Sequence, residues 1–286
     1  MLTRIDRIQL AVPDRESASA GWTELLGAVP AGEDRVECLG ASRSRYRLGR
    51  GFVELLEPAG AGPIADAVAK RGGHLYAAGA ATHDLDALID HLKAQGVEAL
   101  REGNQAFIDP AASGTVGYRA VLSRDEDLPR VGAIDFLYEV TLLVAEARSA
   151  VERCSTLFGL DSGAFVPIDS PHFGYEGVLT LFDRERLHRF EVITPTDLGK
   201  TMGRFFSRFG ESFYMAFAET DRLDEIERRA RELGHRITVV SAPKHNDATD
   251  TIFVHPPALG GMMLGLSRPT LAWRWSGHPE RVEAPQ

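Results

Sequence analysis

The chain is poor in the features that mark several large classes of protein. It has two cysteines, Cys38 and Cys154, and no C-x-x-C spacing, which excludes a disulfide framework. No apolar run approaches the roughly 18 residues of a membrane-spanning helix. No block of lysine and arginine occurs, and the formal net charge is −9 with a pI of about 5.5. We therefore expect neither nucleic acid nor membrane as a partner. Because no apolar signal segment follows Met1, we also expect a cytoplasmic protein.

The overall composition is that of a globular protein. Hydrophobic residues make up 44% of the 286 residues and charged residues 26%. A chain of this length forms one large domain or two of ordinary size, and either can bury a full core.

One short stretch occurs twice, and it indicates a duplicated chain. Gly51–Gly60 and Leu187–Thr196 each contain an apolar run that is interrupted by one acid, Glu54 or Glu191, with a proline four residues after that acid. Other positions also match between the two halves: Tyr76 with Tyr214, and Thr82 with Thr220. The repeat is far longer than the periods of solenoids and propellers, so it predicts two similar domains.

The hydrophobic pattern repeats in the same order within each half. A strand is predicted over 5–12, followed by a helix that begins at Asp14, and a later helix over 85–93 is predicted to be capped by Thr82. In the second half a strand is predicted over 136–144 and a helix over 146–158. The charged, proline-containing stretch 123–130 is the predicted boundary. We thus expect domains at 1–124 and 131–270, with a C-terminal tail at 271–286.

Several phrases resemble the vicinal oxygen chelate superfamily, whose members include glyoxalase I, methylmalonyl-CoA epimerase, bleomycin-resistance proteins and type I extradiol dioxygenases. The phrases are Ile5–Asp14, Phe52–Pro58, Asp84–Leu88 and Ala106–Pro110. The resemblance implies an α+β fold of four βαβββ modules in two tandem glyoxalase-like half-barrel domains, with the site inside the half-barrel. Four modules in one chain look most like the two-domain layout of the extradiol dioxygenases.

The resemblance also implies four ligand positions in each domain. Carried onto this sequence, they are Arg7, Glu54, Tyr76 (or Ala77) and Arg119 in the first domain, and Glu139, Glu191, Tyr214 and Gly265 in the second. The family pattern has His at the first and third positions and Glu at the fourth, and this chain matches none of these. We therefore expect a degenerate metal site, in which Glu139 and Glu191 are the ligands if a divalent metal binds. Redox iron needs two histidines and a carboxylate, which argues against a dioxygenase.

In the first domain, strand alternation predicts that Arg7, Glu54 and Arg119 share one face. Two guanidinium groups repel a metal ion, so this set is either a buried ion-pair network or a site for a ligand carboxylate or phosphate. Together with Tyr76, these residues are our substrate-binding candidates in this half.

In the second domain the predicted inward face carries two acids and a phenol. Alternation predicts that Glu139, Thr141, Arg189, Glu191, Tyr214, Ala216, Met263 and Gly265 share this face. Paired carboxylates raise one pKa, as a general base near neutral pH requires, so Glu139, Glu191 and Tyr214 are the catalytic candidates. Arg189 is a substrate-binding candidate or an ion-pair partner of Glu191. His172, in the stretch 169–176, is a substrate-binding candidate on a lid or an ordinary hairpin.

Three functions remain open from the sequence. The first is a lyase, isomerase or epimerase that acts on a small oxygenated organic substrate in the C-terminal half-barrel. The second is a non-catalytic protein that sequesters a small molecule, as bleomycin-resistance relatives do. An extradiol dioxygenase is the third and least favoured. We expect a small-molecule ligand as partner, and a homodimer as the candidate assembly.

Overall fold

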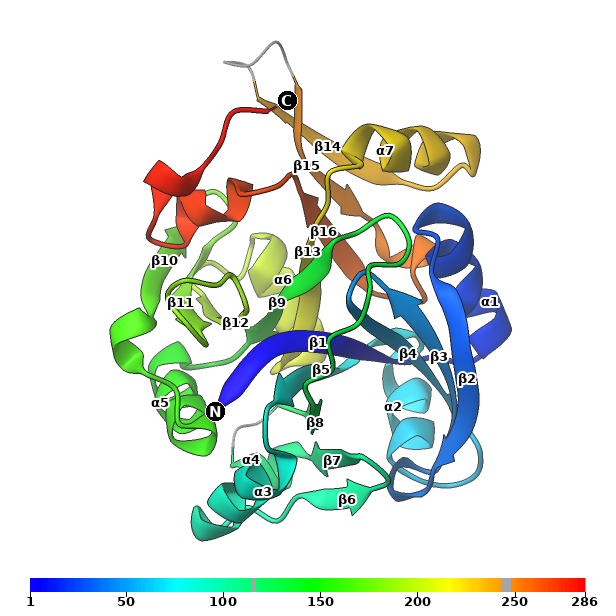
Figure 1. The fold of residues 1–286 in the computed structure, drawn as a ribbon, viewed down its shortest axis with the longest axis vertical. Helices are drawn as coiled ribbons and strands as arrows, with labels where there is room; N and C mark the ends of the chain where they lie inside the picture. Colours follow the sequence, from blue (N-terminus) through cyan, green and yellow to red (C-terminus); the bar gives the residue numbers. More distant parts are fainter. Residues whose placement is uncertain (115–116, 243–247, 286) are drawn as a thin grey trace. The chain divides into compact units, whose positions relative to one another are not determined.

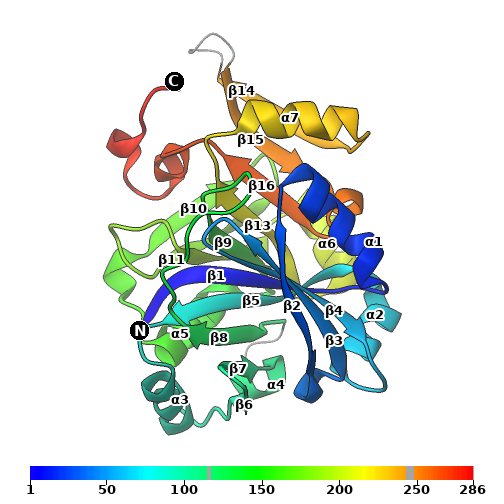
Figure 2. The same ribbon diagram turned by 45° about the vertical axis from the view of Figure 1, so that its right-hand side comes forward.

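The structure is a computed structural model that describes residues 1–114, 117–242 and 248–285. It is an α+β fold built on two eight-stranded sheets, which form two tandem glyoxalase-like half-barrels, as the sequence predicted. Figures 1 and 2 follow the first half of the chain from blue to green and the second half from green to red. In the part of the chain that is described, no helix combines the length and the apolar character needed to cross a membrane.

The first sheet uses only strands from the N-terminal half, in the order β2-β3-β4-β1-β5-β8-β7-β6. The first βαβββ module contributes β1 to β4, and β1 lies parallel to β4. The second contributes β5 to β8, and β5 lies parallel to β8. The elements are β1 (Leu2–Ala11), α1 (Arg15–Ala20), β2 (Val29–Val36), β3 (Ala41–Leu48), β4 (Gly51–Pro58), α2 (Pro63–Arg71), β5 (His74–Thr82), α3 (Leu85–Ala94), β6 (Leu100–Glu102), β7 (Gln105–Ile108), α4 (Pro110–Ser113) and β8 (Ala120–Arg124).

The second sheet repeats this topology with strands from the C-terminal half, in the order β10-β11-β12-β9-β13-β16-β15-β14. Here β9 lies parallel to β12, and β13 lies parallel to β16. The elements are β9 (Phe136–Leu143), α5 (Ala147–Phe158), β10 (Val166–Ser170), β11 (Tyr175–Leu181), β12 (Arg189–Pro195), α6 (Thr201–Phe209), β13 (Ser212–Glu219), α7 (Leu223–Glu232), β14 (Ile237–Ala242), β15 (Ala248–Val254) and β16 (Met263–Ser267).

Equivalent hydrogen bonds in the two halves support the duplication inferred from the sequence. Thr82, at the end of β5, donates from its hydroxyl to the carbonyl of Met1 at 3.0 Å, just before β1. Thr220, just after β13, donates to the carbonyl of Ala133 at 2.5 Å, shortly before β9. The matched threonines therefore make the same kind of contact, to the backbone that leads into the first strand of each half.

The chain also divides into two compact units that do not follow the two halves. One unit contains Met1–Ile5, Ala77–Glu126 and Glu139–Tyr214, and the other contains Asp6–Tyr76, Asp127–Tyr138 and Met215–Gln286. All strands of one sheet lie within 1–124 and all strands of the other within 131–270. The domain boundaries drawn from the sequence stay a prediction.

The sequence predicted helix α5 correctly, including the residues at which it begins and ends. Glu146 caps the helix by accepting from the backbone N–H groups of Arg148 and Ser149. The helix ends at Gly159, whose φ of 58° lies in the left-handed region that glycine adopts without strain. Its apolar side packs on β11 and β12, where Phe158 contacts Phe190 with ring centroids 6.0 Å apart.

Other local predictions were wrong or incomplete. The N-cap of α3 is Asp84, whose side chain accepts from the N–H of Ala87 at 3.0 Å, whereas Thr82 is the last residue of β5. The elements that the sequence did not predict include β6, α4, β10, α6 and β14. These are short elements, and three of them are strands at the ends of sheets or next to them, where the apolar pattern is weak.

Candidate functional site

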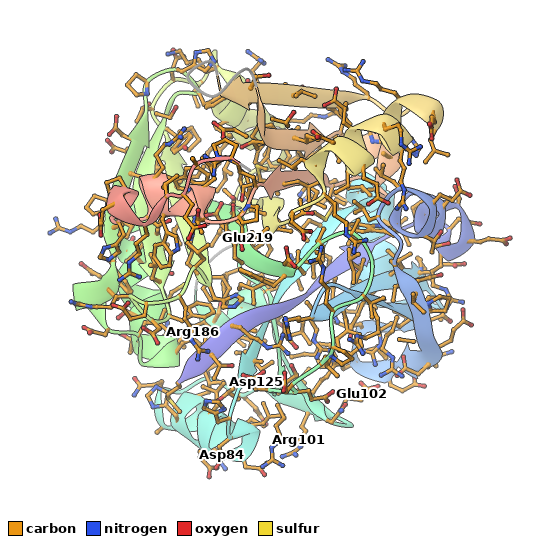
Figure 3. All side chains as sticks on the ribbon, turned by 45° about the horizontal axis from the view of Figure 1, so that its top comes forward. Asp84, Arg101, Glu102, Asp125, Arg186 and Glu219 are labelled. Atoms are coloured by element: carbon orange, nitrogen blue, oxygen red, sulfur yellow. The ribbon has the colours of Figure 1, made fainter. Side chains whose placement is uncertain are left out.

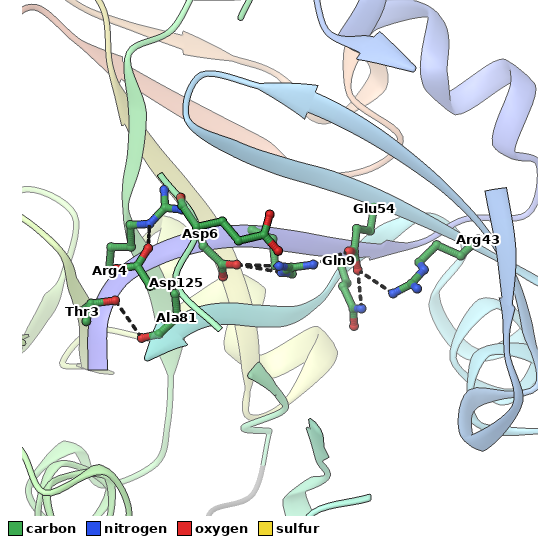
Figure 4. Close-up of polar contacts among 10 residues, drawn as sticks. Thr3, Arg4, Asp6, Gln9, Arg43, Glu54, Ala81 and Asp125 are labelled. Atoms are coloured by element: carbon green, nitrogen blue, oxygen red, sulfur yellow. Dashed lines mark hydrogen bonds and ion pairs between the residues drawn. The ribbon is translucent and has the colours of Figure 1, made fainter. Parts of the chain in front are cut away.

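In the N-terminal half, Glu54 of β4 lies at the centre of a buried polar cluster (Figure 4). Arg7 of β1 donates from Nη1 to Oε1 of Glu54 at 2.7 Å. The other oxygen, Oε2, accepts from Nε2 of Gln9 at 2.7 Å and from Nη1 of Arg43 at 3.2 Å. Asp6 forms an ion pair with Arg7 at 2.6 Å, so a second acid lies next to this arginine. Both oxygens of Glu54 are thus bound within the protein.

The charges of this cluster neutralise one another. Burial alone disfavours an ionised Glu54, but Arg7, Arg43 and Gln9 outweigh it and hold the pKa of Glu54 below its usual value. Arg43 also forms an ion pair with Asp34 at 2.6 Å. The carboxylate is thus part of a buried ion-pair network, in which Arg43 takes the place expected of Arg119. Whether this set also binds a ligand stays a prediction.

The other candidates of this half lie in different surroundings. Tyr76 is a buried residue of β5 whose ring lies edge-on to His74, with centroids 6.3 Å apart. Arg119 belongs to the other compact unit, and its carbonyl accepts from the N–H of Ala78 at 3.1 Å. The second arginine that contacts Glu54 is Arg43 of β3, which the sequence reasoning did not single out.

In the C-terminal half, an ion pair joins two neighbouring parallel strands of the sheet, β9 and β12. Glu139 of β9 and Arg189 of β12 are register partners. Arg189 donates from Nε to Oε2 of Glu139 at 2.7 Å, and its Nη2 lies 2.7 Å from the same oxygen. Its Nη1 donates to the carbonyl of Leu187 at 3.0 Å. The guanidinium of Arg189 is fully buried and forms an ion pair with Glu139, and its charge also acts on Glu191, the partner considered from the sequence.

Glu191 lies next to this ion pair on β12. Its register partner on β9 is Thr141, whose hydroxyl donates to Oε2 of Glu191. Burial and the neighbouring carboxylate of Glu139 raise the pKa of Glu191 to about 8, and the Thr141 hydrogen bond and Arg189 only partly oppose this. Burial also raises the pKa of Glu139, but there the contact with Arg189 opposes the shift more directly. The two acids titrate as a pair, and the ion pair with Arg189 favours the ionised form of Glu139 and so the protonated form of Glu191.

Two phenols lie close enough to Glu191 to be affected by its charge. Burial and then Glu191 raise the pKa of Tyr214 on β13, and burial followed by Glu191 and Glu139 raises that of Tyr175 on β11. Both rings pack against an apolar cluster that also includes Leu143, Ile193, Met202, Ile168, Phe205 and Phe206. Tyr175 was missed from the sequence, although it lies in the 169–176 stretch flagged as a lid or hairpin.

Comparison of the two halves explains why their glutamates behave differently. Gln9 is the register partner of Glu54, as Thr141 is of Glu191, so Arg7 in the first half corresponds to Glu139 in the second. By the same reasoning Arg43 corresponds to Gly177. Both arginines that contact Glu54 are thus replaced, one by an acid and one by a residue without a side chain. The same position carries an ionised glutamate in one half and a protonated one in the other.

Residues 169–176, which the sequence suggested to be a lid or an ordinary hairpin, belong to a β-hairpin. The strands β10 and β11 pair antiparallel, and His172 lies exposed at the turn, edge-on to Phe173 with ring centroids 4.6 Å apart. His188, which precedes β12, accepts from the N–H of Ile5 through Nδ1 at 3.3 Å.

Two residues expected on the inward face lie on the other side of the sheet. In the register of β13 and β16, Met263 pairs with Met215 and Gly265 pairs with Phe217, whereas Ala216 pairs with Leu264. Because side chains alternate along a strand, Met263 and Gly265 face away from the side that carries Ala216. The prediction was one residue out of register, an error that reverses every side chain of a strand.

In the described ranges 1–114, 117–242 and 248–285, no group of three or more His, Cys, Asp or Glu residues is arranged to hold a metal ion. The two acids named as metal ligands do lie together, but one is bound to Arg189 and the other is protonated at neutral pH.

Comparisons with known proteins agree with this fold. Residues 6–115 match the family model of the Glyoxalase/Bleomycin resistance protein/Dioxygenase superfamily. No curated protein sequence matches the chain significantly. A triple mutant of 4-hydroxymandelate synthase from Streptomyces coelicolor is similar over 99% of this chain and 100% of its own, with 16% identity and a TM-score of 0.72. The halotolerant catechol dioxygenase BphC is similar over 94% of this chain and 87% of its own, with 13% identity and a TM-score of 0.62.

Proposed function

We propose that this chain, a two-domain member of the vicinal oxygen chelate superfamily, is an enzyme of the lyase, isomerase or epimerase type that acts on a small oxygenated organic substrate. The single observation that carries the proposal is Glu191, a buried carboxyl whose pKa is raised to about 8 beside the Glu139–Arg189 ion pair. A pKa near the working pH lets one group both remove and return a proton.

In the proposed reaction Glu191 exchanges a proton with a carbon next to a carbonyl group of the substrate. The ionised form removes the C–H proton, and the electron pair of that bond moves to the carbonyl oxygen to give an enolate. The protonated form then returns the proton to carbon. At pH 7 about one molecule in ten carries Glu191 in its ionised form. This fraction can act as the base, because a carboxylate with a raised pKa takes up a proton more strongly than an ordinary one.

Tyr214 is the proposed hydrogen-bond donor to the oxygen on which negative charge develops. Its raised pKa keeps the phenol protonated at neutral pH. Tyr175 is a second phenol near the same acid. The apolar side chains around both rings, including Phe205 and Phe206, favour a substrate with an apolar body.

The proposed chemistry does not use a metal. A divalent cation needs donors with free lone pairs, and here the guanidinium of Arg189 is bound to Glu139 and places a positive charge beside Glu191. The donor set therefore does not fit such an ion, and the degenerate metal site expected from the sequence is part of this proposal.

Solvent exchange at carbon tests the proposal directly. Probe compounds with a C–H next to a carbonyl or carboxylate, such as phenacyl alcohol and mandelate, are incubated with the protein in D2O and followed by proton NMR. We expect exchange that falls about 100-fold or more in Glu191→Gln and clearly, but by less, in Tyr214→Phe. The matched control is Glu152→Gln, an exposed glutamate on α5, which leaves the rate unchanged.

Full exchange activity in Glu191→Gln would show that this acid is not the base. Tight binding of a probe with no exchange, in the wild type and in both variants, would instead favour the sequestering function.

A further inference from the structure

We propose that the outer edge of β14 is a docking edge for a second copy of this chain, whose own β14 adds to the sheet as an antiparallel strand. β14 lies at one end of the second sheet, and among the described residues β15 is the only strand that pairs with it. The inference concerns assembly, so it holds or fails independently of the reaction proposed for Glu191.

The four strands at the ends of the two sheets differ in how they are protected from further pairing. β2 contains charges of both signs and a proline, β6 has three residues of which two are charged, and β10 contains Pro167 and Asp169. Charge, proline and short length keep an edge strand from pairing with another chain. β14 has the sequence ITVVSA, with neither charge nor proline. It has six residues, against three in β6 at the equivalent end of the first sheet.

The hydrogen bonds to β15 determine which backbone groups of β14 point outward. The N–H of His255 donates to the carbonyl of Arg236 at 3.1 Å, and the register of the two strands is regular from there through Val240. Hydrogen-bonded and non-hydrogen-bonded pairs alternate along antiparallel strands. The N–H and carbonyl groups of Ile237 and Val239 therefore point away from β15, toward the open edge.

Apolar side chains lie exposed along this edge and next to it. Val240 is 44% exposed, and Leu233, at the end of α7, is 39% exposed. Ile237 and Val239 are half-buried. A strand that pairs with β14 removes part of this apolar surface from water, which favours association.

Charge favours a second copy of the chain as the occupant of this edge. The chain carries a net charge of −9, so two copies repel each other unless the surfaces that meet are neutral. β14 is such a surface, because pairing it with itself sets no like charges opposite each other within the strand. The nearby helix α7 packs on β15 (Figure 1). Its exposed charges are paired, Arg228 with Glu232 and Arg231 with Glu227, so a second α7 brings both signs of charge.

A two-fold axis perpendicular to the sheet satisfies the outward groups of both copies at once. Such an axis keeps each face of the sheet continuous, so opposing residues must belong to the same face. With the axis at Thr238, Ile237 of each copy lies opposite Val239 of the other, and each of these pairs exchanges two hydrogen bonds. The strand is short and makes a small interface, so we expect a dissociation constant on the order of micromolar.

Amide hydrogen exchange tests the edge directly. Exchange is followed by NMR at protein concentrations well below and well above the dissociation constant. We expect the amides of Ile237 and Val239 to exchange at least about 10-fold more slowly at the higher concentration, because they are hydrogen-bonded in the dimer alone. The amide of Thr238 points toward β15 in both states and is the internal control. Exchange of Ile237 and Val239 that does not depend on concentration would overturn the proposal.

Two variants test the same edge by sedimentation equilibrium. Val239→Pro removes an outward N–H that the single chain does not use, and proline is tolerated at such edge positions. Val240→Lys places a positive charge opposite Arg236 of the second copy. We expect each to raise the dissociation constant by at least about 10-fold while circular dichroism stays unchanged. The matched control is Leu198→Lys, which also replaces an exposed apolar side chain, 61% exposed and outside β14, and leaves the dissociation constant unchanged.

The remaining outcomes count against the proposal. A wild-type protein that stays monomeric at every concentration would overturn it, and would leave this edge to an extended strand of a different protein. A dimer that persists in both variants would show that the two copies meet at another surface. If Val239→Pro does not fold, Val240→Lys decides between these results.

Discussion

Glu54 and Glu191 show how strongly the neighbours of one residue decide its chemistry. Both are glutamates at equivalent positions of equivalent strands, and both accept a hydrogen bond from their register partner. Glu54 has Arg7 and Arg43 as ion-pair partners, and its pKa is lowered. Glu191 has the acid Glu139 beside it, and its pKa is raised. Burial acts on both in the same direction, so the arginines make the difference.

The structural role of Glu54 gives a prediction for stability. Replacement by Gln leaves two buried guanidinium groups with one partner fewer, so we expect Glu54→Gln to lower the free energy of unfolding by about 3–5 kcal/mol. Urea unfolding followed by circular dichroism measures this change. The control is Glu37→Gln, because Glu37 pairs with Arg35 at the surface and its loss costs less than about 1 kcal/mol. Equal effects of the two substitutions would mean that the Glu54 cluster adds no special stability.

At the scale of the element, capping residues fix where several helices begin. Asp14, Asp84 and Glu146 each accept backbone N–H groups in the first turn of α1, α3 and α5. The sequence identified two of these starts but assigned the start of α3 to Thr82. The hydroxyl of Thr82 instead contacts the carbonyl of Met1, a contact between residues far apart in the sequence.

Because Asp84 and not Thr82 caps α3, we expect substitutions of Asp84 and of Asp90 to affect stability differently. The side chain of Asp84, labelled in Figure 3, accepts from the N–H of Ala87. Asp84→Ala removes this acceptor, so we expect the free energy of unfolding to fall by about 1 kcal/mol. Asp90→Ala, at an exposed position inside the same helix, is the control, and we expect it to be neutral or slightly stabilising. Thermal unfolding of both variants measures the effect. Equal stability of the two would show that Asp84 does not cap the helix.

At the scale of the whole molecule, one buried and one half-buried acid make stability depend on pH in an unusual direction. The pKa of Glu191 is raised to about 8, and burial raises that of Glu219 to about 7, with Asp135 adding to the shift. Glu219, which is labelled in Figure 3, ends β13. Its carboxylate accepts from the N–H of Thr270 at 2.9 Å. Between pH 4.5 and about 8 the folded protein holds protons on these acids that the unfolded chain has released.

The stability from these two acids is therefore fully present below pH 4.5 and is lost as the pH rises to about 8. We expect the free energy of unfolding of the wild type to be lower at pH 8 than at pH 5, by about 2 kcal/mol or more. Urea unfolding at the two pH values measures the difference. In a double variant with Glu191→Gln and Glu219→Gln we expect most of this difference to vanish. A pH dependence that survives in the double variant would show that other groups cause it.

Repeated phrases in the sequence by themselves indicated the duplication, because such phrases are properties of neighbouring residues. The resemblance of those phrases to the vicinal oxygen chelate superfamily implied the α+β fold and the candidate positions Glu139, Glu191 and Tyr214. Ion-pair partners do not follow from such signals. The partners of an ion pair depend on which strands lie side by side and in what register. This holds for the contact of Glu54 with Arg43 and for that of Glu139 with Arg189. The proton on Glu191 and the presence of Tyr175 beside it were also decided by tertiary structure, because burial and nearby charges shift a pKa only once distant segments of the chain have come together.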